Sequence, residues 1–420
     1  MKGGMYMAIF CRRLKNTKVR LRGLAFFLLI TLLCGTFQFL WSESCFAEES
    51  LSMYSGAYAL MDGETGRVLT GKEENIPMAN ASTTKILTCI VTLENCDLNE
   101  MVTVSSYASA QPKVHLGMKE KEQYPLKDLL YGLMLESYND CAVAIAEHVA
   151  GSTENFAKMM NEKAKEIGCK DTYLITPNGL DAENEENFHH TTAEDLCRMM
   201  AYCTWESPMK DVFLQITQTR NYTGESNGRE YSLVNRNAFL NQMDGVLSGK
   251  TGFTNKAGYC YVAAMEVNGE KYTIALLACG WPNNKNYKWK DARTLFEYGM
   301  EHYDVKTVKV KGFTEKIQVD GFTDRTKFGN LNKKSDLQLY TKKQEYQLLM
   351  KAEDNIETEI ILYTDTKLPI KEGQNMGECN IYLNNMLVDK LPILASENVY
   401  IWGWKDILYT IFYQFLTFSL

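Results

Sequence analysis

The chain has 420 residues, of which 45% are hydrophobic and 23% charged, and its formal net charge is -7 at pH 7. This length and composition allow two or three globular domains with large cores and exclude a disordered chain. A nucleic-acid-binding face needs clustered Lys and Arg, so the mildly acidic balance excludes nucleic acid as a partner.

The N-terminus has the pattern of an export signal. A basic stretch from Arg12 to Arg22 precedes an uncharged run over residues 23–41. The small residue at the end of Cys45-Phe46-Ala47 predicts cleavage after Ala47, which gives a signal peptide over 1–47. The alternative is an uncut membrane anchor. In both cases positive charge stays inside, so the body of the protein is expected outside the cytoplasm.

Cysteine and histidine patterns give no metal signal. Nine cysteines follow the signal, their spacing is irregular and there is no CxxC pair, so neither a zinc site nor a dense disulfide framework is predicted. Several stand in apolar runs, as Cys260 and Cys279 do, which is typical of small buried hydrophobes. His148 is isolated and is interpreted as structural, while His189 and His190 are expected to fix a loop. We predict no metal and no cofactor.

The first elements of the mature chain are a hairpin and a helix. Residues 57–61 and 67–70 read as two strands around a Gly-containing turn. From Ser82 onward, apolar residues recur at helical spacing, which predicts a mostly buried helix that begins at Ser82. The Ser82 hydroxyl is then expected at the positive end of the helix dipole.

More helices are expected over 126–135, 141–149, 153–167 and 192–202, which together form a helical subdomain. Asp140 is the predicted N-cap of the second of these helices. Thr191 and Glu194 form a capping-box pattern before the last one.

The chain then becomes strand-rich. Residues 258–267 and 271–279 read as strands joined by Asn268-Gly269, a strong hairpin signal, and 291–302 as a closing helix. Alternating residues over about 305–396 predict a second, all-β domain.

The tail over 399–420 reads as an amphipathic helix. Its uncharged part is about 21 Å long, too short to span a bilayer, so an interfacial position is predicted, with a core or dimer helix as the alternative.

Three short motifs carry the chemistry: Ser82-Thr83-Thr84-Lys85, Ser137-Tyr138-Asn139 and Lys250-Thr251-Gly252. On a helix, residues three apart share a face, so Ser82 and Lys85 lie together. A serine hydroxyl needs a base, and Lys85 serves if burial and the charge of Lys250 keep it neutral. Each motif alone also fits a helix cap or a surface lysine. Their joint occurrence in helix, loop and strand settings predicts an acyl-transfer site.

In this interpretation the remaining motif residues bind substrate and move protons. Ser137 relays a proton to the leaving amine, and Asn139 holds the peptide bond of the substrate and the Lys85 amine. Lys250 and Thr251 hold a substrate carboxylate. Gly252 allows a close backbone approach.

These motifs, in this order, resemble those of the penicillin-recognising serine acyltransferases. Longer strings narrow the resemblance to serine-type D-alanyl-D-alanine carboxypeptidases, the low-molecular-mass penicillin-binding proteins similar to penicillin-binding protein 5. The resemblance covers about 55–395 and includes a membrane-binding tail. Its strings include Ala81-Ser82-Thr83-Thr84-Lys85, residues 128–135, Ala146-Glu147-His148-Val149-Ala150-Gly151, residues 249–254 and residues 368–374.

The resemblance implies an α/β (α+β) transpeptidase/β-lactamase-like fold with an antiparallel sheet and a helical subdomain. It places a catalytic domain at 48–304, a small all-β domain at 305–396 and a membrane-anchor helix at 397–420. It also implies attack by Ser82 and an oxyanion hole from the backbone N–H groups of Ser82 and Phe253. Lys288 stands where relatives often carry an arginine that holds the terminal carboxylate.

The expected function is removal of the terminal D-alanine from peptidoglycan stem pentapeptides, at the extracytoplasmic face of the bacterial membrane, with β-lactam antibiotics as inhibitors. Tyr138 stands where many relatives have a small residue, so a narrower or more aromatic pocket rim is expected. Between Asn139 and Lys250 the sequence lacks the Glu-x-x-Leu-Asn string of one β-lactamase class, which predicts slow penicillin turnover. A D,D-endopeptidase acting on cross-links and a penicillin-sensing module remain as alternatives.

Overall fold

The computed structural model describes residues 51–321, 334–342, 344–363, 366–401 and 403–417. The predicted signal peptide over 1–47 lies outside these residues. The chain divides into two compact units, Met1–Met53 and Tyr54–Leu420, and every helix and strand below belongs to the second.

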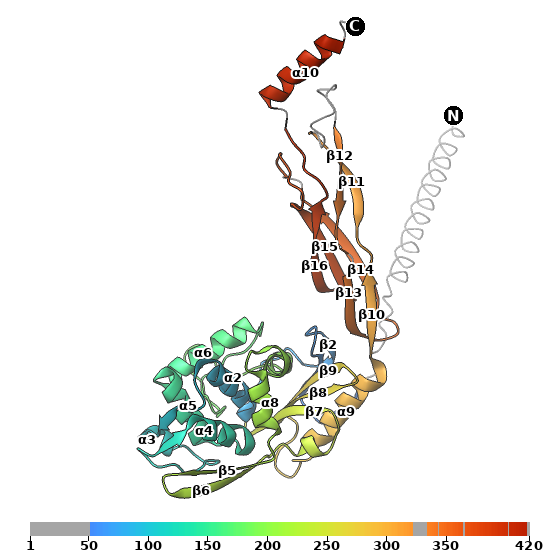
Figure 1. Cartoon of the computed structure of the whole chain (residues 1–420). Coiled ribbons are helices and arrows are strands. Elements are labelled where there is room, and N and C mark those ends of the chain that lie inside the picture. Colours follow the sequence, from blue (N-terminus) through green and yellow to red (C-terminus); the bar gives the residue numbers. More distant parts are fainter. Residues whose placement is uncertain (1–50, 322–333, 343, 364–365, 402, 418–420) are drawn as a thin grey trace, which may run out of the picture. The chain divides into compact units, whose positions relative to one another are not determined.

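The site is built on a five-stranded antiparallel sheet (Figure 1). Its strand order is β2-β1-β9-β8-β7, so β7 forms one edge. The predicted hairpins β1–β2 and β8–β9 are both present, the latter turning at Asn268-Gly269. The strands are β1 (Ala57–Asp62), β2 (Val68–Lys72), β7 (Val246–Thr254), β8 (Gly258–Val267) and β9 (Glu270–Leu277).

Side chains alternate between the two faces of the sheet along each strand, and helices cover both faces. Ala59 and Ala275 belong to the main hydrophobic core on one face, where α7 (Ala193–Ala201) packs on the sheet. On the other face, α9 (Tyr287–His302) packs against β8 and β9, and its Gly299 lies against the ring of Tyr272. The nearly continuous apolar character of β8 and β9 follows from this double burial.

A helical subdomain surrounds α2 (Lys85–Asn95), the helix that follows Ser82. Its helices are α3 (Ser106–Ser109), α4 (Leu126–Tyr131), α5 (Asn139–Ala150), α6 (Thr153–Glu166) and α8 (Lys210–Gln218). The helices α4 and α7 each continue into a π-helical turn, Gly132–Glu136 (η2) and Tyr202–Glu206 (η3). Two small antiparallel sheets complete it, the pair β3–β4 (Met101–Thr103, Gln123–Pro125) and the hairpin β5–β6 (Asn221–Ser226, Arg229–Val234).

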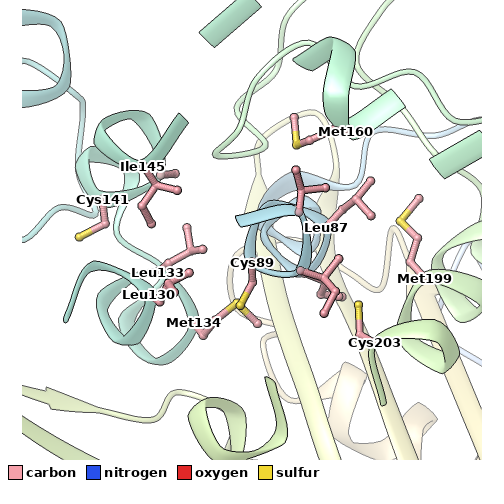
Figure 2. Close-up of a cluster of buried hydrophobic side chains, with 14 of the residues drawn as sticks. Leu87, Cys89, Leu130, Leu133, Met134, Cys141, Ile145, Met160, Met199 and Cys203 are labelled. Atoms are coloured by element: carbon pink, nitrogen blue, oxygen red, sulfur yellow. The ribbon is translucent and has the colours of Figure 1, made fainter. Parts of the chain in front are cut away.

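Figure 2 shows how α2 is held in this subdomain. Leu87 and Cys89 project from α2 into a cluster that Met134 and Cys203 join from opposite sides. These four residues are at most 5% exposed, which confirms that cysteines such as Cys89 act as small core residues. Of the nine cysteines in the described part of the chain, all are free and only Cys96 and Cys169 are less than fully buried.

Two predicted helix caps are wrong. The helix α5 begins at Asn139, so Asp140 lies inside its first turn and does not cap it. The buried Asp140 carboxylate instead accepts hydrogen bonds from the backbone N–H groups of residues 116, 117 and 118, at 3.0, 2.9 and 3.2 Å. At α7 the N-cap is Thr192, one residue after the predicted Thr191, and its hydroxyl accepts from the backbone of Asp195 at 3.0 Å.

The C-terminal part of the described chain is all-β, as predicted, before a final helix. One sheet has the order β11-β12-β16-β15-β14, and β10 pairs separately with β13. Leu337, Leu339 and Ile393 form the centre of its core. The strands are β10 (Asp304–Val310), β11 (Thr314–Val319), β12 (Ser335–Tyr340), β13 (Gln344–Met350), β14 (Ile356–Leu362), β15 (Asn375–Leu383) and β16 (Met386–Ala395).

The last described helix is α10 (Trp404–Thr417). Its Trp404, Leu408, Phe412 and Phe415 are all more than half exposed. Among the described helices, none combines the length and apolarity needed to cross a bilayer.

Candidate active site

Ser82 lies in a 3-10 turn, η1 (Ala81–Thr84), that runs directly into α2. The preceding Ala81 has φ 49°, a left-handed conformation that costs a non-glycine residue energy and is often found at functional sites. Lys85 is the first residue of α2 and is fully buried. Its Nζ lies 2.8 Å from Ser82 Oγ, so the serine and the lysine of the first motif are in direct contact.

The Lys85 amine has two further partners, both of which only accept hydrogen bonds. It donates to Asn139 Oδ1 at 3.0 Å and to the backbone oxygen of Asn178 at 2.6 Å. Burial holds the pKa of Lys85 well below its usual range, and the neighbouring charge of Lys250 lowers it further. Asn139 in turn donates from Nδ2 to the oxygen of Pro112 at 3.1 Å, which fixes the orientation of its amide.

The second and third motifs meet at Ser137. This residue joins the π-helical turn to α5 with φ 65° and ψ 31°, so the loop carries it in a left-handed conformation. Lys250, on the edge strand β7, donates to Ser137 Oγ at 2.9 Å and to the oxygen of Thr251 at 2.8 Å. Burial lowers the pKa of Lys250 to about 7. The structure thus brings all three motifs to one place.

Gly252 is where β7 passes close to Ser82. A Cβ at this position would lie 3.0 Å from the backbone nitrogen of Ser82 and 3.0 Å from the oxygen of Asn80. Only a residue without a side chain allows this approach. The edge of the sheet and the start of α2 therefore form one wall of the site.

These groups open into a cleft of about 600 Å³. It is lined by Ser82, Lys113, Val114, Glu136, Ser137, Asn139, Leu180, Arg236, Thr251, Gly252, Phe253, Tyr259, Lys288 and Trp289. Lys288 Nζ lies 4.7 Å and 4.5 Å from the ring centres of Tyr259 and Trp289, so its charge faces aromatic rings. Burial lowers its pKa to about 8.

Tyr138 does not narrow this cleft, contrary to the sequence-based expectation. Its side chain packs against the main core and is absent from the cleft lining. Next to it, a Cβ on Gly132 would lie 3.2 Å from the Tyr138 ring. The small residue at position 132 gives the ring room to turn inward. The aromatic wall of the cleft comes from Phe253, Tyr259 and Trp289 instead.

Sequence reasoning missed Asn178. Its backbone oxygen holds Lys85, and its amide donates to Gln111 Oε1 at 3.1 Å. Gly179 has φ +79° and lies so close to the Ala81 carbonyl that a Cβ there would be 2.0 Å from its oxygen. Pro177-Asn178-Gly179 is a turn signal in the sequence, but a backbone carbonyl leaves no mark on residue identity.

His189 connects the segment before the 177–179 turn to Thr84. Its Nδ1 accepts from the backbone N–H of Ile175 at 2.9 Å, so its Nε2–H faces Thr84 Oγ1, also at 2.9 Å. Burial lowers the pKa of His189 to about 3, which keeps the ring neutral. The histidine fixes a loop, as the sequence suggested.

Two family models match long segments of the chain. The model of the family described as D-alanyl-D-alanine carboxypeptidase matches residues 44–278, and that of the penicillin-binding protein 5 C-terminal domain matches 323–400. The chain is 27% identical to D-alanyl-D-alanine carboxypeptidase DacF of Bacillus subtilis, over 89% of this chain and 94% of that one. It is 33% identical to the carboxypeptidase DacB2 of Mycobacterium tuberculosis, over 58% of this chain and 81% of that one.

A solved structure of penicillin-binding protein 5 from Haemophilus influenzae shares the fold. The TM-score is 0.63 with 20% identity, over 84% of this chain and 99% of that one. The family match spans more than half of the chain and contains all three motifs. The chain belongs to the D-alanyl-D-alanine carboxypeptidase family of serine peptidases.

Proposed function

We propose that Ser82 is the acylated nucleophile of this serine D-alanyl-D-alanine carboxypeptidase and that Lys85 is its general base. The observation that carries the proposal is the set of three contacts made by the Lys85 amine. A neutral amine has two N–H donors and one lone pair. Asn139 Oδ1 and the Asn178 oxygen use the donors, which leaves the lone pair for the Ser82 hydroxyl.

The same contacts support the following order of proton transfers. Ser82 Oγ attacks the carbonyl carbon of the penultimate D-alanine while its proton passes to Lys85, and an ester bond forms. The C–N bond then breaks, and the leaving D-alanine takes a proton through Ser137, which hydrogen-bonds to Lys250. A water molecule hydrolyses the ester, and Ser82 regains its proton. One water is consumed for each D-alanine released.

The backbone N–H groups of Ser82 and Phe253 are proposed to hold the oxyanion. The close approach of Gly252 to the Ser82 nitrogen supports this, because it brings the two donors to the same wall of the cleft. One such donor is typically worth about 3 to 4 kcal/mol of transition-state stabilisation.

Lys250 and Thr251 are proposed to bind the terminal carboxylate of the substrate from the edge of the cleft. The Lys288 ammonium, held against Tyr259 and Trp289, adds positive charge to the same cleft. A lysine provides a point charge without the planar fork of an arginine, so this contact is less directional. β-Lactam antibiotics are proposed to acylate Ser82 in the same cleft, because they imitate the D-Ala-D-Ala end.

We further propose that the enzyme is exported through its N-terminal signal and works on peptidoglycan at the membrane surface. The helix α10 supports this, since it has 14 residues with exposed apolar side chains and is therefore about 21 Å long. Such a helix lies in the bilayer interface. Deletion of 399–420 should release the protein from anionic phospholipid vesicles with catalysis unchanged. Continued sedimentation with the vesicles would contradict the anchor.

The central test is D-alanine release from a peptide ending in D-Ala-D-Ala, with the chain from residue 48 onward. Ser82→Ala should abolish both release and formation of a covalent penicillin adduct. Release that persists in Ser82→Ala contradicts the assignment of the nucleophile. An adduct on Ser82 without release of D-alanine, combined with cleavage of a cross-linked dimer of stem peptides, would favour the endopeptidase alternative.

A further inference from the structure

A cysteine, a glutamate and a histidine meet at the far ends of the two helices that carry the active site. Cys96 follows the last residue of α2, and His148 lies in the last turn of α5. Glu100 stands in the loop after α2. The ligand atoms of these three side chains all lie within 4.8 Å of one another. None of the three takes part in the mechanism above.

The cluster is preorganised and accessible. One Glu100 oxygen accepts from the backbone N–H of Asp97 at 2.8 Å, and the other faces His148 Nε2 at 2.8 Å. The side chains of His148 and Glu100 are 23% and 43% exposed, so an ion in solution can reach them. Cys96 is partly exposed, unlike most cysteines in the described part of the chain.

From this geometry we propose that Cys96, Glu100 and His148 form a zinc-binding site that links the end of α2 to the end of α5. Thiolate, imidazole and carboxylate are the three ligand types that Zn²⁺ prefers. Tetrahedral zinc with its usual bond lengths separates its ligand atoms by about 3.4 to 3.6 Å. His148 Nε2 and Glu100 Oε2, now 2.8 Å apart, would therefore move apart by about 0.6 Å, and the Cys96 sulfur would move toward them by up to about 1.2 Å. The fourth position takes a water molecule.

Binding changes the protonation of the site in a defined way. The thiol of Cys96 gives up its proton to become the ligand. When Zn²⁺ binds Nε2 of His148, a proton held on that nitrogen moves to Nδ1 of the same ring or to solvent. The spacing of residues in the sequence did not indicate this site. Cys96 and Glu100, near the end of α2, meet His148 only through the packing of α2 on α5.

The probes are Zn²⁺ and Co²⁺, added to the purified chain kept reduced and free of any chelating tag. Titration calorimetry should give one Zn²⁺ per chain with a dissociation constant of about 1 μM or below. Co²⁺ should give a thiolate-to-metal charge-transfer band. At a hundredfold excess over the dissociation constant, Zn²⁺ should raise the thermal midpoint by about 5 °C or more.

Three variants make the test specific. Cys96→Ser should abolish the charge-transfer band and weaken Zn²⁺ binding at least about tenfold, and His148→Gln should weaken it to a similar degree. Cys169→Ser removes the other cysteine that is partly exposed among the described residues, and this variant should bind Zn²⁺ as the parent chain does. Because the readouts are spectra, stoichiometry and midpoint, the result is independent of peptidase activity.

Two results would overturn the proposal. One is a Co²⁺ complex without thiolate absorption, which identifies adventitious binding to surface carboxylates only. The other is Zn²⁺ affinity that Cys96→Ser and His148→Gln both leave unchanged while their midpoints show that they are folded.

Discussion

Gly252→Ala tests how the edge strand positions the oxyanion donors. The added methyl group would lie 3.0 Å from the Ser82 nitrogen, 3.0 Å from the Asn80 oxygen and 3.1 Å from the Ala81 Cβ. Ordinary van der Waals separations are about 3.5 to 4.0 Å, so β7 and the turn before α2 must move apart by about 0.5 to 1 Å. Gly252 does not have positive φ, so alanine fits the backbone and the chain should fold.

This displacement acts on the transition state more than on binding. A misplacement of about 1 Å typically costs 100-fold in rate, and complete loss of one oxyanion donor costs 100- to 1,000-fold. We expect acylation to slow by about 100-fold, which corresponds to about 2.7 kcal/mol of activation free energy. Non-covalent binding of the peptide should change much less.

The assay is the second-order rate of adduct formation with a fluorescent penicillin, beside the thermal midpoint. Ser248→Ala is the matched control, because Ser248 lies in the same strand and its buried hydroxyl has no hydrogen-bond partner among the described residues. It should acylate at the parent rate. If Gly252→Ala also acylates within threefold of the parent chain, the close approach of β7 does not set the oxyanion geometry and the reasoning fails.

Three further predictions concern titratable groups. Lys85→Arg places a cation without a lone pair next to Ser82 at neutral pH, so acylation should slow by about 100- to 10,000-fold. The folded variant should still bind penicillin reversibly. An unchanged acylation rate would exclude Lys85 as the base. In the parent chain, kcat/KM for the peptide should fall as pH rises above about 7, because Lys250 then loses the charge that binds the carboxylate. Lys250→Arg should flatten this decrease of kcat/KM at alkaline pH. A decrease that stays at the same pH in the variant would show that another group causes it. His189 should show no imidazole titration by NMR between pH 5 and 8, since its pKa is about 3, and a midpoint in that range would mean that Nδ1 is not held by the backbone.

The sequence by itself predicted the candidate catalytic groups and determined their local settings. Ser82 lies in the 3-10 turn that leads into α2, and Lys85 is the first residue of α2, three residues later than the predicted helix start. Lys250 lies in a strand, as predicted, because helical and strand periodicity are local properties of the chain. The same local patterns predicted the hairpins of the main sheet and the burial of Cys260 and Cys279.

Only the tertiary structure decided which groups meet from distant parts of the chain. The Asn178 carbonyl that orients Lys85 is a backbone atom, and every residue has one, so no residue type announces it. The sequence pattern predicted a helix cap at Asp140, but the packing places the backbone of residues 116–118 against its carboxylate. Tyr138 packs against the core beside Gly132, where the missing side chain leaves room for its ring. Such contacts depend on how helices pack, and the spacing of residues along the chain does not encode them directly.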